Sequence, residues 1–374
     1  MKKILYFVDR LLPGGVQSFL KTLSKELPKD EYKIDFLVLD DGNDYSKYEK
    51  EYLDLGVSIH KLDGIWIRHL KDYKPFEKKI GAFFKENKFD IVHINSGPKN
   101  YVVAKYAKKC GTKMVVYHSH NTDYQTKNII KKVYGNSLKK KVAKYSTDYL
   151  ACSFEAGQWM YSKKILNSDS FKIIHNPIIV KDFAFDEKER TKRRKETGFT
   201  DDFVIGNIGR LSKQKNQKFL IQIMSELVKK CPNARLALVG QGELKNELEK
   251  LTKELGLSNN ISFLGFRSDV NKLLNAFDLI VMPSFFEGYP IVSIEAQANG
   301  LPCLMSDTIT KEALLKDNSS MLSLSDSPEK WAEYILDNYI NKKNDRVAPK
   351  SIEQYDSSYI VKQLIELYCR EQSI

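Results

Sequence analysis

Residues 279–305 read LIVMPSFFEGYPIVSIEAQANGLPCLM, and this stretch decides the fold. The apolar run Leu279–Met282 is typical of a short buried strand, and the apolar spacing of Ile291–Asn299 is typical of a helix. Gly300 favours the end of that helix, and the apolar run Pro302–Met305 follows it at once. The stretch therefore predicts a strand, a helix and a second strand, in the order that builds a parallel sheet.

The same alternation continues on both sides of this stretch. In the second half of the chain, further strands are expected at Phe203–Gly209, Arg235–Val239 and Ile261–Phe263, and further helices at Phe219–Lys230, Leu244–Leu255 and Val270–Asn275. In the first half, strands are expected at Ile4–Val8, Ile34–Leu39, Ile91–Ile94 and Met114–Tyr117, and helices at Gln17–Leu27 and Phe76–Lys88. Alternation of this kind is typical of an α/β fold whose parallel sheets are covered by helices on both faces.

Two Rossmann-like domains account for this pattern, and we expect them to face each other across a cleft. Residues 1–178 form the N-terminal domain and residues 203–354 the C-terminal domain, and the charged, pattern-poor segment 179–202 is interpreted as a linker or a solvated helix. We expect a C-terminal helix at about residues 355–374 to pack back on the N-terminal domain. Because ligands of such sheets bind beyond the carboxyl ends of the strands, the cleft is the expected site.

The composition is that of a soluble globular protein, with 42% hydrophobic and 29% charged residues among 374. The five cysteines have no C-x-x-C spacing, so reduced thiols are expected rather than a metal or disulfide role. The apolar run Ile4–Val8 is too short for a signal peptide, and no run reaches the roughly 20 apolar residues of a membrane span. These features favour a cytoplasmic protein.

The net charge of +12 is distributed unevenly along the chain. Residues 1–180 hold 32 Lys and Arg against 20 Asp and Glu, whereas residues 181–374 hold 28 of each kind. The whole surplus therefore lies in the first half, which favours an anionic partner there: a nucleic acid, an anionic membrane or an acidic ligand.

One basic segment concentrates part of this surplus. Residues 127–144 contain seven lysines and no acidic residue, and apolar residues are interleaved with the lysines. The pattern is similar to a basic amphipathic surface that lies on an anionic leaflet, and a soluble helix with a basic face is the alternative. Gly135-Asn136 interrupts the periodicity, so a single helix is not assured. The candidate membrane or acceptor surface consists of Lys131, Lys132, Lys139, Lys140 and Lys141.

Two carboxylates flank the start of the helix in the opening stretch. Glu287 lies in the loop just before that helix, and Glu295 lies about one turn inside it. Pro290 suits the first turn of a helix, whose free N–H groups and partial positive charge favour a phosphate. Carboxylates at these positions can accept hydrogen bonds from the hydroxyls of a sugar and a ribose.

A second constellation of residues follows the strand expected at Phe203–Gly209. Residues 206–216 read GNIGRLSKQKN, in which Gly209 allows the backbone to approach a ligand closely. Arg210 and Lys215 can both reach one diphosphate, the first with a fork of donors and the second as a point charge. A solvated basic loop is the alternative.

Together these motifs resemble the retaining glycosyltransferases of the GT-B fold, family 4 type. Glu287 and Glu295 match the E-x7-E signature of that family, and the G-R-L turn at Gly209 followed by Lys215 matches a second signature. Family members usually carry Gly after that lysine, whereas this sequence has Asn216.

The resemblance implies a set of site residues. Glu287 would contact the donor sugar, Glu295 the ribose hydroxyls, and the Gly14-Gly15 loop the donor phosphates and the acceptor. The implied catalytic residues are His120, Arg210, Lys215 and Glu287. The further donor-binding positions are Gly209, Gln241, Phe266, Arg267, Gly288, Tyr289, Pro290 and Ile291.

A histidine after the strand Met114–Tyr117 completes the implied site. His120 matches the family position near the donor sugar, and His118 is the alternative. Two histidines at this spacing could hold a metal, but only Asp123 accompanies them at ligand spacing. No D-x-D triplet occurs, which argues against the metal-dependent class of glycosyltransferases. We therefore expect neither a metal nor a cofactor.

The resemblance implies transfer of a hexose or N-acetylhexosamine from a nucleoside diphosphate sugar, with a UDP-sugar as the expected donor. The implied acceptor is a lipid-linked saccharide of bacterial capsule or exopolysaccharide assembly, at the inner face of the cell membrane. A nucleotide-sugar epimerase of the GT-B fold and a glycosyltransferase with a soluble acceptor are the alternatives. A nucleic-acid binder is not expected, because the basic half contains no aromatic-basic stacking motif and no helix-turn-helix.

Overall fold

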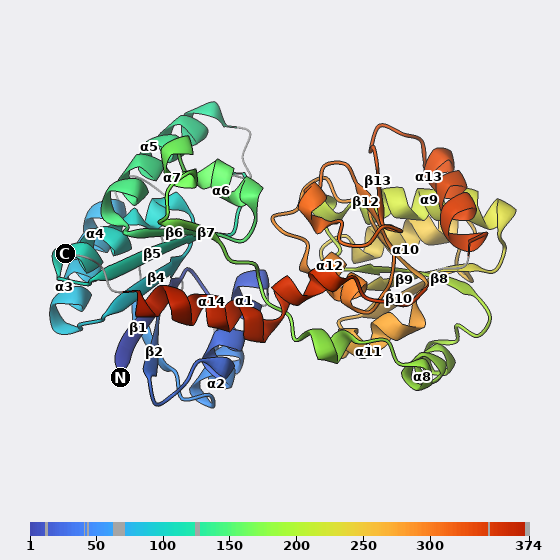
Figure 1. Cartoon of the computed structure of the whole chain (residues 1–374). Coiled ribbons are helices and arrows are strands. Elements are labelled where there is room, and N and C mark those ends of the chain that lie inside the picture. Colours follow the sequence, from blue (N-terminus) through green and yellow to red (C-terminus); the bar gives the residue numbers. More distant parts are fainter. Residues whose placement is uncertain are drawn as a thin grey trace. The chain divides into compact units, whose positions relative to one another are not determined.

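The structure is a computed structural model that describes residues 1–11, 14–40, 42, 45–62, 72–123, 128–342 and 345–370, without the side chains of 47 and 129–131. The chain divides into two compact units, each built around a parallel sheet (Figure 1). Unit 1 comprises Met1–Ile178 and the C-terminal segment that begins at Gln354, and unit 2 comprises Ile179–Glu353.

Unit 1 contains a sheet with the strand order β3-β2-β1-β4-β5-β6-β7, in which all the pairs are parallel. Its strands are β1 (Lys2–Val8), β2 (Tyr32–Leu39), β3 (Ser58–Leu62), β4 (Ile91–Asn95), β5 (Met114–Ser119), β6 (Asp148–Ala151) and β7 (Phe171–Ile173). Its helices are α1 (Gly15–Glu26), α2 (Ser46–Leu53), α3 (Tyr73–Glu86), α4 (Tyr101–Lys109), α5 (Ile129–Tyr145), α6 (Phe154–Met160), α7 (Lys163–Leu166) and α14 (Ser357–Cys369). Figure 1 shows these helices on both faces of the sheet.

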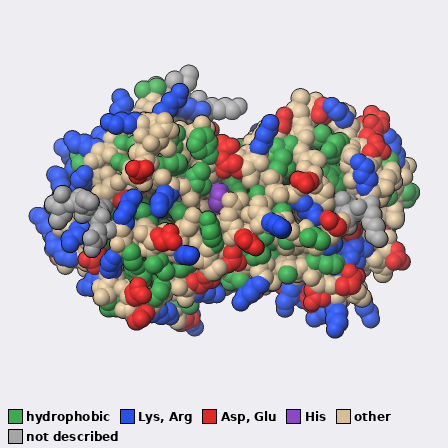
Figure 2. Space-filling view, viewed as in Figure 1, with side chains coloured by type: hydrophobic (Ala, Val, Ile, Leu, Met, Phe, Trp, Pro, Cys, Tyr) green, Lys and Arg blue, Asp and Glu red, His purple; other side chains and the backbone are tan. Residues whose placement is uncertain are grey.

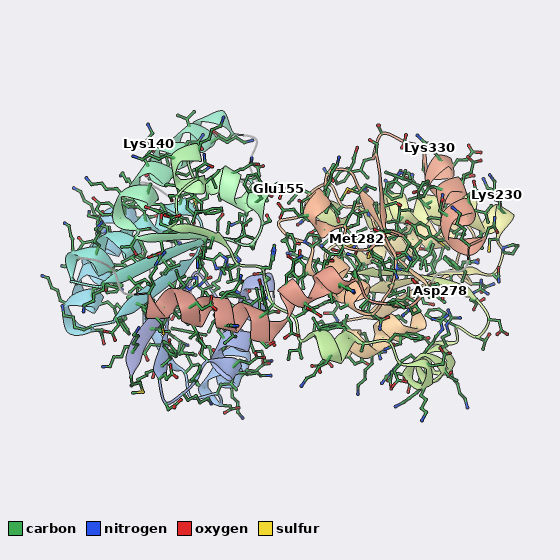
Figure 3. The ribbon with its side chains drawn as sticks, viewed as in Figure 1. Lys140, Glu155, Lys230, Asp278, Met282 and Lys330 are labelled. Atoms are coloured by element: carbon green, nitrogen blue, oxygen red, sulfur yellow. The ribbon has the colours of Figure 1, made fainter. Side chains whose placement is uncertain are left out.

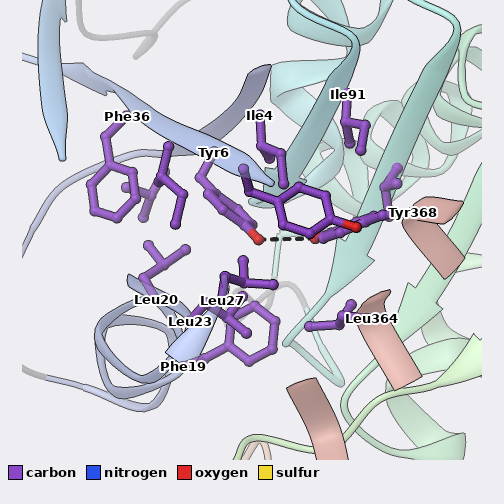
Figure 4. Close-up of a cluster of buried hydrophobic side chains, with 14 of the residues drawn as sticks. Ile4, Tyr6, Phe19, Leu20, Leu23, Leu27, Phe36, Ile91, Leu364 and Tyr368 are labelled. Atoms are coloured by element: carbon purple, nitrogen blue, oxygen red, sulfur yellow. Dashed lines mark hydrogen bonds between the residues drawn. The ribbon is translucent and has the colours of Figure 1, made fainter. Parts of the chain in front are cut away.

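The C-terminal helix α14 is fixed to unit 1 by its apolar face. Leu364 of α14 packs in one cluster with Ile4 and Tyr6 of β1 and Leu23 of α1 (Figure 4). All four side chains are fully buried, and burying one large apolar side chain contributes about 1.5–3 kcal/mol. The last described helix of the chain therefore completes the core around the first strand.

Unit 2 contains a sheet with the strand order β10-β9-β8-β11-β12-β13, again with parallel pairs. Its strands are β8 (Phe203–Ile208), β9 (Ala234–Val239), β10 (Ile261–Gly265), β11 (Leu279–Met282), β12 (Cys303–Ser306) and β13 (Ser320–Leu322). Its helices are α8 (Glu187–Thr197), α9 (Gln217–Lys230), α10 (Lys245–Glu254), α11 (Val270–Leu273), α12 (Ile291–Ala298) and α13 (Pro328–Ile335).

The segment 179–202, interpreted from the sequence as a linker or a solvated helix, belongs to unit 2 and contains a helix. Its charged residues form α8, and two of its arginines hold one carboxylate of the sheet. Arg190 and Arg194 bond to the two oxygens of Asp278, at 2.6 and 2.5 Å, and Asp278 is labelled in Figure 3. Asp278 also accepts a hydrogen bond from the backbone N–H of Val204, at 2.8 Å. These two arginines therefore hold α8 beside β8 and β11, although a run of charged residues usually indicates exposure to solvent.

In both sheets the strand order changes direction beside the first strand of the unit. β1 lies between β2 and β4, and β8 lies between β9 and β11. Such a switch point opens a crevice at the carboxyl ends of the strands, where ligands of these folds bind. The predicted fold class, α/β with two Rossmann-like domains, is confirmed.

Candidate active site

The loop between β11 and α12 carries Glu287. β11 ends at Met282, which Figure 3 labels, and α12 begins at Ile291. Glu287 Oε1 accepts hydrogen bonds from Lys215 Nζ at 2.7 Å and from Ser284 Oγ at 2.6 Å. The side chains of Lys215 and Glu287 are only 19% and 7% exposed, so water screens their attraction weakly. The lysine and the serine together hold the carboxylate in one orientation.

Lys215 reaches Glu287 from the connection between β8 and α9. It ends the short 3-10 turn Lys213–Lys215, and Asn216 follows in the left-handed conformation, with φ 55°. Asn is one of the few residues other than Gly that tolerate this conformation. The local backbone therefore explains why Asn216 can stand where the resembled family usually has Gly.

A glycine loop after β9 supports the loop that carries Lys215. Gly209 N donates to Val239 O at 2.9 Å, and Leu211 N donates to Gln241 O at 3.0 Å. Gly240 has φ 143°, and a Cβ at this position would lie 1.9 Å from Gly209 O. Only glycine allows the two loops to approach so closely. The Gln241 side chain is exposed beside them.

Glu295 is the fifth residue of α12 and is half-buried. Burial raises the pKa of its carboxyl to about 7. Within the residues that the structure describes, its side chain forms no hydrogen bond and no ion pair. A desolvated carboxylate with open lone pairs is suited to accept hydrogen bonds from the hydroxyls of a ligand.

Two arginines that were predicted to contact the donor, Arg210 and Arg267, form ion pairs with carboxylates in the structure. Arg210 is 73% exposed and bonds Glu243 Oε2 through Nε at 3.2 Å and Nη2 at 3.1 Å. Arg267 forms two hydrogen bonds with Asp269, at 2.7 and 2.6 Å, and this pairing is the largest cause that lowers the pKa of Asp269. Lys215 and Glu287 are therefore brought together as predicted, but neither arginine joins their ion pair.

The remaining predicted donor positions lie at a loop and at two helix starts. Phe266 follows β10 with its ring 68% exposed. In unit 2, the run Gly288, Tyr289 and Pro290 leads directly into Ile291, the first residue of α12. In unit 1, Gly14 precedes Gly15, the first residue of α1. The first N–H groups of a helix have no partner within it, so the starts of α1 and α12 are suited to an anion.

His120 lies directly after β5, where its ring is partly exposed. Its Nε2 lies 2.9 Å from Asn95 Oδ1, and burial lowers the pKa of His120 to about 3. His118, the alternative left open by the sequence, is fully buried and bonds to His93 and to the carbonyl of Ile174. The structure therefore favours His120 over His118 as the histidine that can reach a ligand.

A polar cluster at the ends of β1 and β4 was not predicted. Asp9 Oδ1 accepts hydrogen bonds from Ser96 Oγ at 2.8 Å and from Asn100 Nδ2 at 2.5 Å. Lys99 Nζ lies 3.5 Å from the second oxygen of Asp9. Asp9 and Ser96 directly follow apolar strands, so the polar residues after each predicted strand are the signal that could have indicated this cluster.

Two family models match the chain and together cover most of it. The model described as Glycosyltransferase Family 4 matches residues 13–181, and the model described as Glycosyl transferases group 1 matches residues 188–353. The chain belongs to the family 4 glycosyltransferases.

Relatives support this assignment along most of the chain. Glycosyltransferase EpsF of Bacillus subtilis is 28% identical over 338 residues, which span 89% of this chain and 87% of EpsF. The UDP-Gal:alpha-D-GlcNAc-diphosphoundecaprenol alpha-1,3-galactosyltransferase of Escherichia coli is 25% identical, over 89% of this chain and 85% of its own length.

Solved structures support the fold. HepE of Anabaena in complex with UDP superimposes with a TM-score of 0.79 at 21% identity, covering 98% of this glycosyltransferase and 99% of HepE. The lipopolysaccharide outer core galactosyltransferase WaaB has a TM-score of 0.70 at 17% identity, covering 98% of each chain. Likeness at these identities shows the GT-B fold.

Residues 129–144 of the basic segment of this glycosyltransferase lie in one helix. α5 runs through Gly135 and Asn136 without interruption, because Leu138 and Val142 are buried and hold it against the unit 1 core. Val133 and Tyr134 point outward instead, with 65% and 39% of their area exposed. The amphipathic face is therefore mixed, and part of the interleaved apolar residues belongs to the core.

Two lysines of α5, Lys139 and Lys141, are bonded to side chains or carbonyls of unit 1. Lys139 donates to the carbonyl of Trp159 and lies 4.3 Å from its ring centroid, and burial lowers the pKa of Lys139 to about 8. Lys141 bonds Tyr101 Oη at 3.2 Å.

Lys132 lies 3.8 Å from exposed Asp123, and Lys140 is exposed, as Figure 3 shows. The side chain of Lys131 lies outside the described residues. Figure 2 shows further Lys and Arg side chains gathered over α3, α4 and α5.

The described residues contain neither a membrane-spanning helix nor a cluster of metal ligands. Among them, no helix combines the length and the apolar content that are needed to cross a bilayer. The same residues contain no group of three or more His, Cys, Asp or Glu side chains that could hold a metal ion.

Proposed function

We propose that this glycosyltransferase moves a hexose or an N-acetylhexosamine from a UDP-sugar to a lipid-linked saccharide, with retention of configuration, in capsule or exopolysaccharide assembly. The ion pair between Lys215 and Glu287, beside the start of α12, carries this proposal. It places a cation, a carboxylate and the positive end of the α12 dipole at the carboxyl ends of β8 and β11. A nucleoside diphosphate sugar needs all three, for its phosphates and for its hydroxyls.

The leaving diphosphate is stabilised by Lys215 and the N-terminus of α12. Loss of one such preorganised group costs on the order of a few kcal/mol in the transition state. Arg210 can add its fork of donors after it leaves Glu243, because an ion pair as exposed as theirs is worth little. With the positive charge supplied by protein groups, the reaction needs no metal ion.

The hydroxyls are held by carboxylates and positioned by the histidine. Glu287 accepts from the donor sugar, and Glu295 accepts from the ribose. His120 positions the donor sugar as a neutral ring. In the front-face scheme that retention implies, the departing phosphate takes the acceptor proton, so no separate general base is assigned.

Relatives support the choice of donor and acceptor. HepE has been solved with UDP and with UDP-glucose, and its 21–22% identity to this chain shows fold alone. The name of the Escherichia coli relative gives it a UDP-sugar donor and a diphosphoundecaprenol-linked acceptor. Transfer to a lipid-linked saccharide on the inner face of the membrane is the corresponding proposal for this chain.

A peripheral membrane contact through α5 is part of the proposal. The basic surplus of residues 1–180, the exposed Lys140 and the exposed apolar pair Val133 and Tyr134 support it. Each basic residue near an anionic leaflet contributes about 1 kcal/mol, so a few of them are enough for reversible docking.

Ligand-induced shifts in melting temperature test the donor assignment. The protein is titrated with UDP, GDP and a panel of UDP-sugars, since a ligand at 100 times its Kd stabilises a fold by about 2.7 kcal/mol. UDP and one UDP-sugar are expected to raise Tm, and Lys215→Met is expected to remove most of that shift because it deletes the phosphate contact.

Lys213→Met is the matched control, because Lys213 is exposed on the same 3-10 turn and has no role in the proposed site. It should keep the full shift. A shift with GDP but not UDP would overturn the choice of base. An unchanged shift in Lys215→Met would overturn the site.

A further inference from the structure

Glu287 accepts hydrogen bonds from two donors of different kinds. Lys215 Nζ and Ser284 Oγ both donate to the same carboxylate oxygen, Oε1, at 2.7 and 2.6 Å. Lys215 is a cation on a long, flexible stem, whereas Ser284 is a neutral group that is only 1% exposed. The two donors therefore respond differently to an anionic ligand.

Lys215 has two anionic partners under the proposed function. The structure pairs it with Glu287, and the proposed transfer assigns it to the diphosphate of the donor. A diphosphate carries more charge than a carboxylate, so it attracts an ammonium more strongly at equal distance. Binding of the diphosphate is therefore expected to draw Lys215 Nζ away from Glu287, while Ser284 stays where it is.

Ser284 is fixed from the neighbouring strand. β11 and β12 are parallel, with Met282, which Figure 3 labels, opposite Met305, so the loops that follow them leave the same edge of the sheet. Ser306 Oγ lies 2.6 Å and Thr308 Oγ1 lies 2.7 Å from the carbonyl oxygen of Ser284. The two hydroxyl oxygens lie 2.8 Å from each other. The backbone of Ser284 is thereby tied to the end of β12.

The number of hydroxyl protons shows how firmly this carbonyl is held. Ser306 and Thr308 have one hydroxyl proton each for three contacts. If one hydroxyl donates to the other, the second can still donate to the carbonyl of Ser284, and otherwise both can donate to it. One of the two hydroxyls is therefore enough to hold the carbonyl. Ser284, Ser306 and Thr308 are called the hydroxyl network.

We propose that the ion pair of Lys215 and Glu287 is a latch that the diphosphate of the donor opens, and that the hydroxyl network then keeps Glu287 oriented toward the donor sugar. The inference rests on the proposed glycosyl transfer and adds an exchange of partners to it. The members of the hydroxyl network are positioning residues, because they act on the ligand through Glu287.

A latch of this kind lowers the affinity for UDP. The side chains of Lys215 and Glu287 are 19% and 7% exposed, so water screens the pair weakly and the diphosphate must compete with it. Glu287→Gln removes the competing charge. The Kd for UDP is therefore expected to fall by about fivefold, although Glu287 is itself a proposed contact of the donor sugar.

The substitution Lys215→Met separates the latch from a general effect of charge. Removal of a carboxylate near a diphosphate could tighten UDP binding without any latch. In the Lys215→Met background the latch is absent, so Glu287→Gln should change the Kd for UDP by about twofold or less. Calorimetric titration of the wild type, the two single variants and the double variant measures this. An equal gain in both backgrounds, or weaker UDP binding in Glu287→Gln alone, would overturn the latch.

Ser284→Ala tests the hydroxyl network. It removes the donor that holds Glu287 once the latch is open, so kcat for transfer from the UDP-sugar is expected to fall by about tenfold. Added to Glu287→Gln, the same substitution should cost little more, because the carboxylate that Ser284 positions is already gone. A loss of equal size in both backgrounds would mean that Ser284 only stabilises the loop, and the positioning role would be wrong.

Ser319→Ala is the matched control for Ser284→Ala. Ser319 is 8% exposed, and its Oγ accepts a hydrogen bond from the backbone N–H of Cys303 at 2.9 Å. Cys303 is the first residue of β12 and Ser306 is the last, so the control removes a buried hydroxyl at the opposite end of the same strand. It should leave kcat at the wild-type value even if Tm falls. Equal losses of kcat in the two variants would also overturn the positioning role.

The two hydroxyls that hold the carbonyl of Ser284 are expected to substitute for each other. Ser306→Ala and Thr308→Val each leave one donor, so each alone should lower kcat by about twofold or less. The double variant leaves neither hydroxyl and should approach the loss seen in Ser284→Ala. A double variant whose loss is only the product of the two single losses would show that these hydroxyls do not act through the carbonyl.

The wild-type protein keeps the two proposals apart. A wild type that binds no UDP-sugar would contradict the proposed function before any variant is compared. A wild type that binds UDP and transfers the sugar, with an affinity for UDP that Glu287→Gln does not raise, would contradict the latch alone. We expect transfer by the wild type together with tighter UDP binding in Glu287→Gln.

Discussion

At the scale of the residue, the exposed fraction of the side chain distinguishes Lys215 from Arg210, although the sequence predicted both as contacts of the diphosphate. Lys215 and Glu287 are 19% and 7% exposed, whereas Arg210 and Glu243 are 73% and 53% exposed. Water screens the second pair far more than the first. Lys215 is therefore held in place before any ligand arrives, and Arg210 must exchange its partner to take part.

The raised pKa of Glu295 predicts how nucleotide binding depends on pH. Its carboxyl ionises at about pH 7, and the ionised form accepts hydrogen bonds from ribose hydroxyls more strongly. Affinity for UDP is therefore expected to rise between pH 6 and pH 8, and Glu295→Gln should flatten this rise. Calorimetric titration with UDP at several pH values measures it, and an equally steep rise in the variant would exclude Glu295 as its cause.

The raised pKa of Glu295 also predicts how the free energy of unfolding depends on pH. The sign of this dependence is opposite to the usual case, in which folding lowers the pKa of a carboxyl group. Because its folded-state pKa is raised, the folded protein retains a proton that the unfolded chain releases, so stability falls as pH rises from about 4.5 to about 7. Glu295→Gln should match wild type near pH 4 and exceed it at pH 8, on the order of 2 kcal/mol in the free energy of unfolding.

The sequence predicted which residues belong to the site better than it predicted their hydrogen-bond partners. The E-x7-E spacing located Glu287 and Glu295. The partners of Arg210 and Arg267 could not be derived, because Glu243 lies 33 positions away from the first and nothing in the local pattern selects Asp269 for the second. The choice between His118 and His120 likewise needed the position of α14, whose Tyr368 bonds His93 behind them.

At the scale of the element, apolar runs and their punctuation decided what could be predicted. The long central strands and the amphipathic helices appear within a few residues of their expected bounds. Three short strands, β3, β6 and β13, were not predicted. Each of the three begins with a polar residue, and β3 also contains His60 and Lys61. The strand that ends at Ile173 was predicted from the proline that follows it. The sequence did not show that the helix in the charged segment 179–202 packs on unit 2, because its arginines have their partner, Asp278, far along the chain.

Lys140 of α5, which is exposed, gives a prediction on membrane contact. Lys140→Glu reverses a charge on the candidate membrane surface, whereas Lys139 is already bound to Trp159 and contributes less to an outside partner. Binding to vesicles that contain an anionic lipid is expected to weaken on the order of tenfold in a sedimentation assay. High salt should weaken the wild type as well, since salt screens exposed charges.

Lys250→Glu is the control for this effect. Lys250 is 78% exposed on α10 of unit 2, so the substitution changes the net charge equally at a remote place. It should leave vesicle binding near the wild-type value. Equal losses in both variants would show that only the net charge of the molecule matters, and α5 would not be the contact.

At the scale of the whole molecule, strand–helix alternation was enough to predict two Rossmann-like domains, and the family models agree with it. Helix α14 belongs to unit 1, because its apolar face completes the cluster around β1. The fold does not determine which sugar and which acceptor are used. Both depend on the shape of the ligand-bound site, and many relatives share the same architecture.

The most direct test of the central claim is a transfer assay with a panel of UDP-sugars and a lipid-linked saccharide acceptor, followed by NMR of the new glycosidic linkage. We predict one UDP-sugar as donor, a product with the donor's anomeric configuration, and a rate about 10²–10³-fold lower in Lys215→Met but unchanged in Lys213→Met. An inverted linkage, no transfer from any UDP-sugar, or an undiminished rate in Lys215→Met would contradict the account.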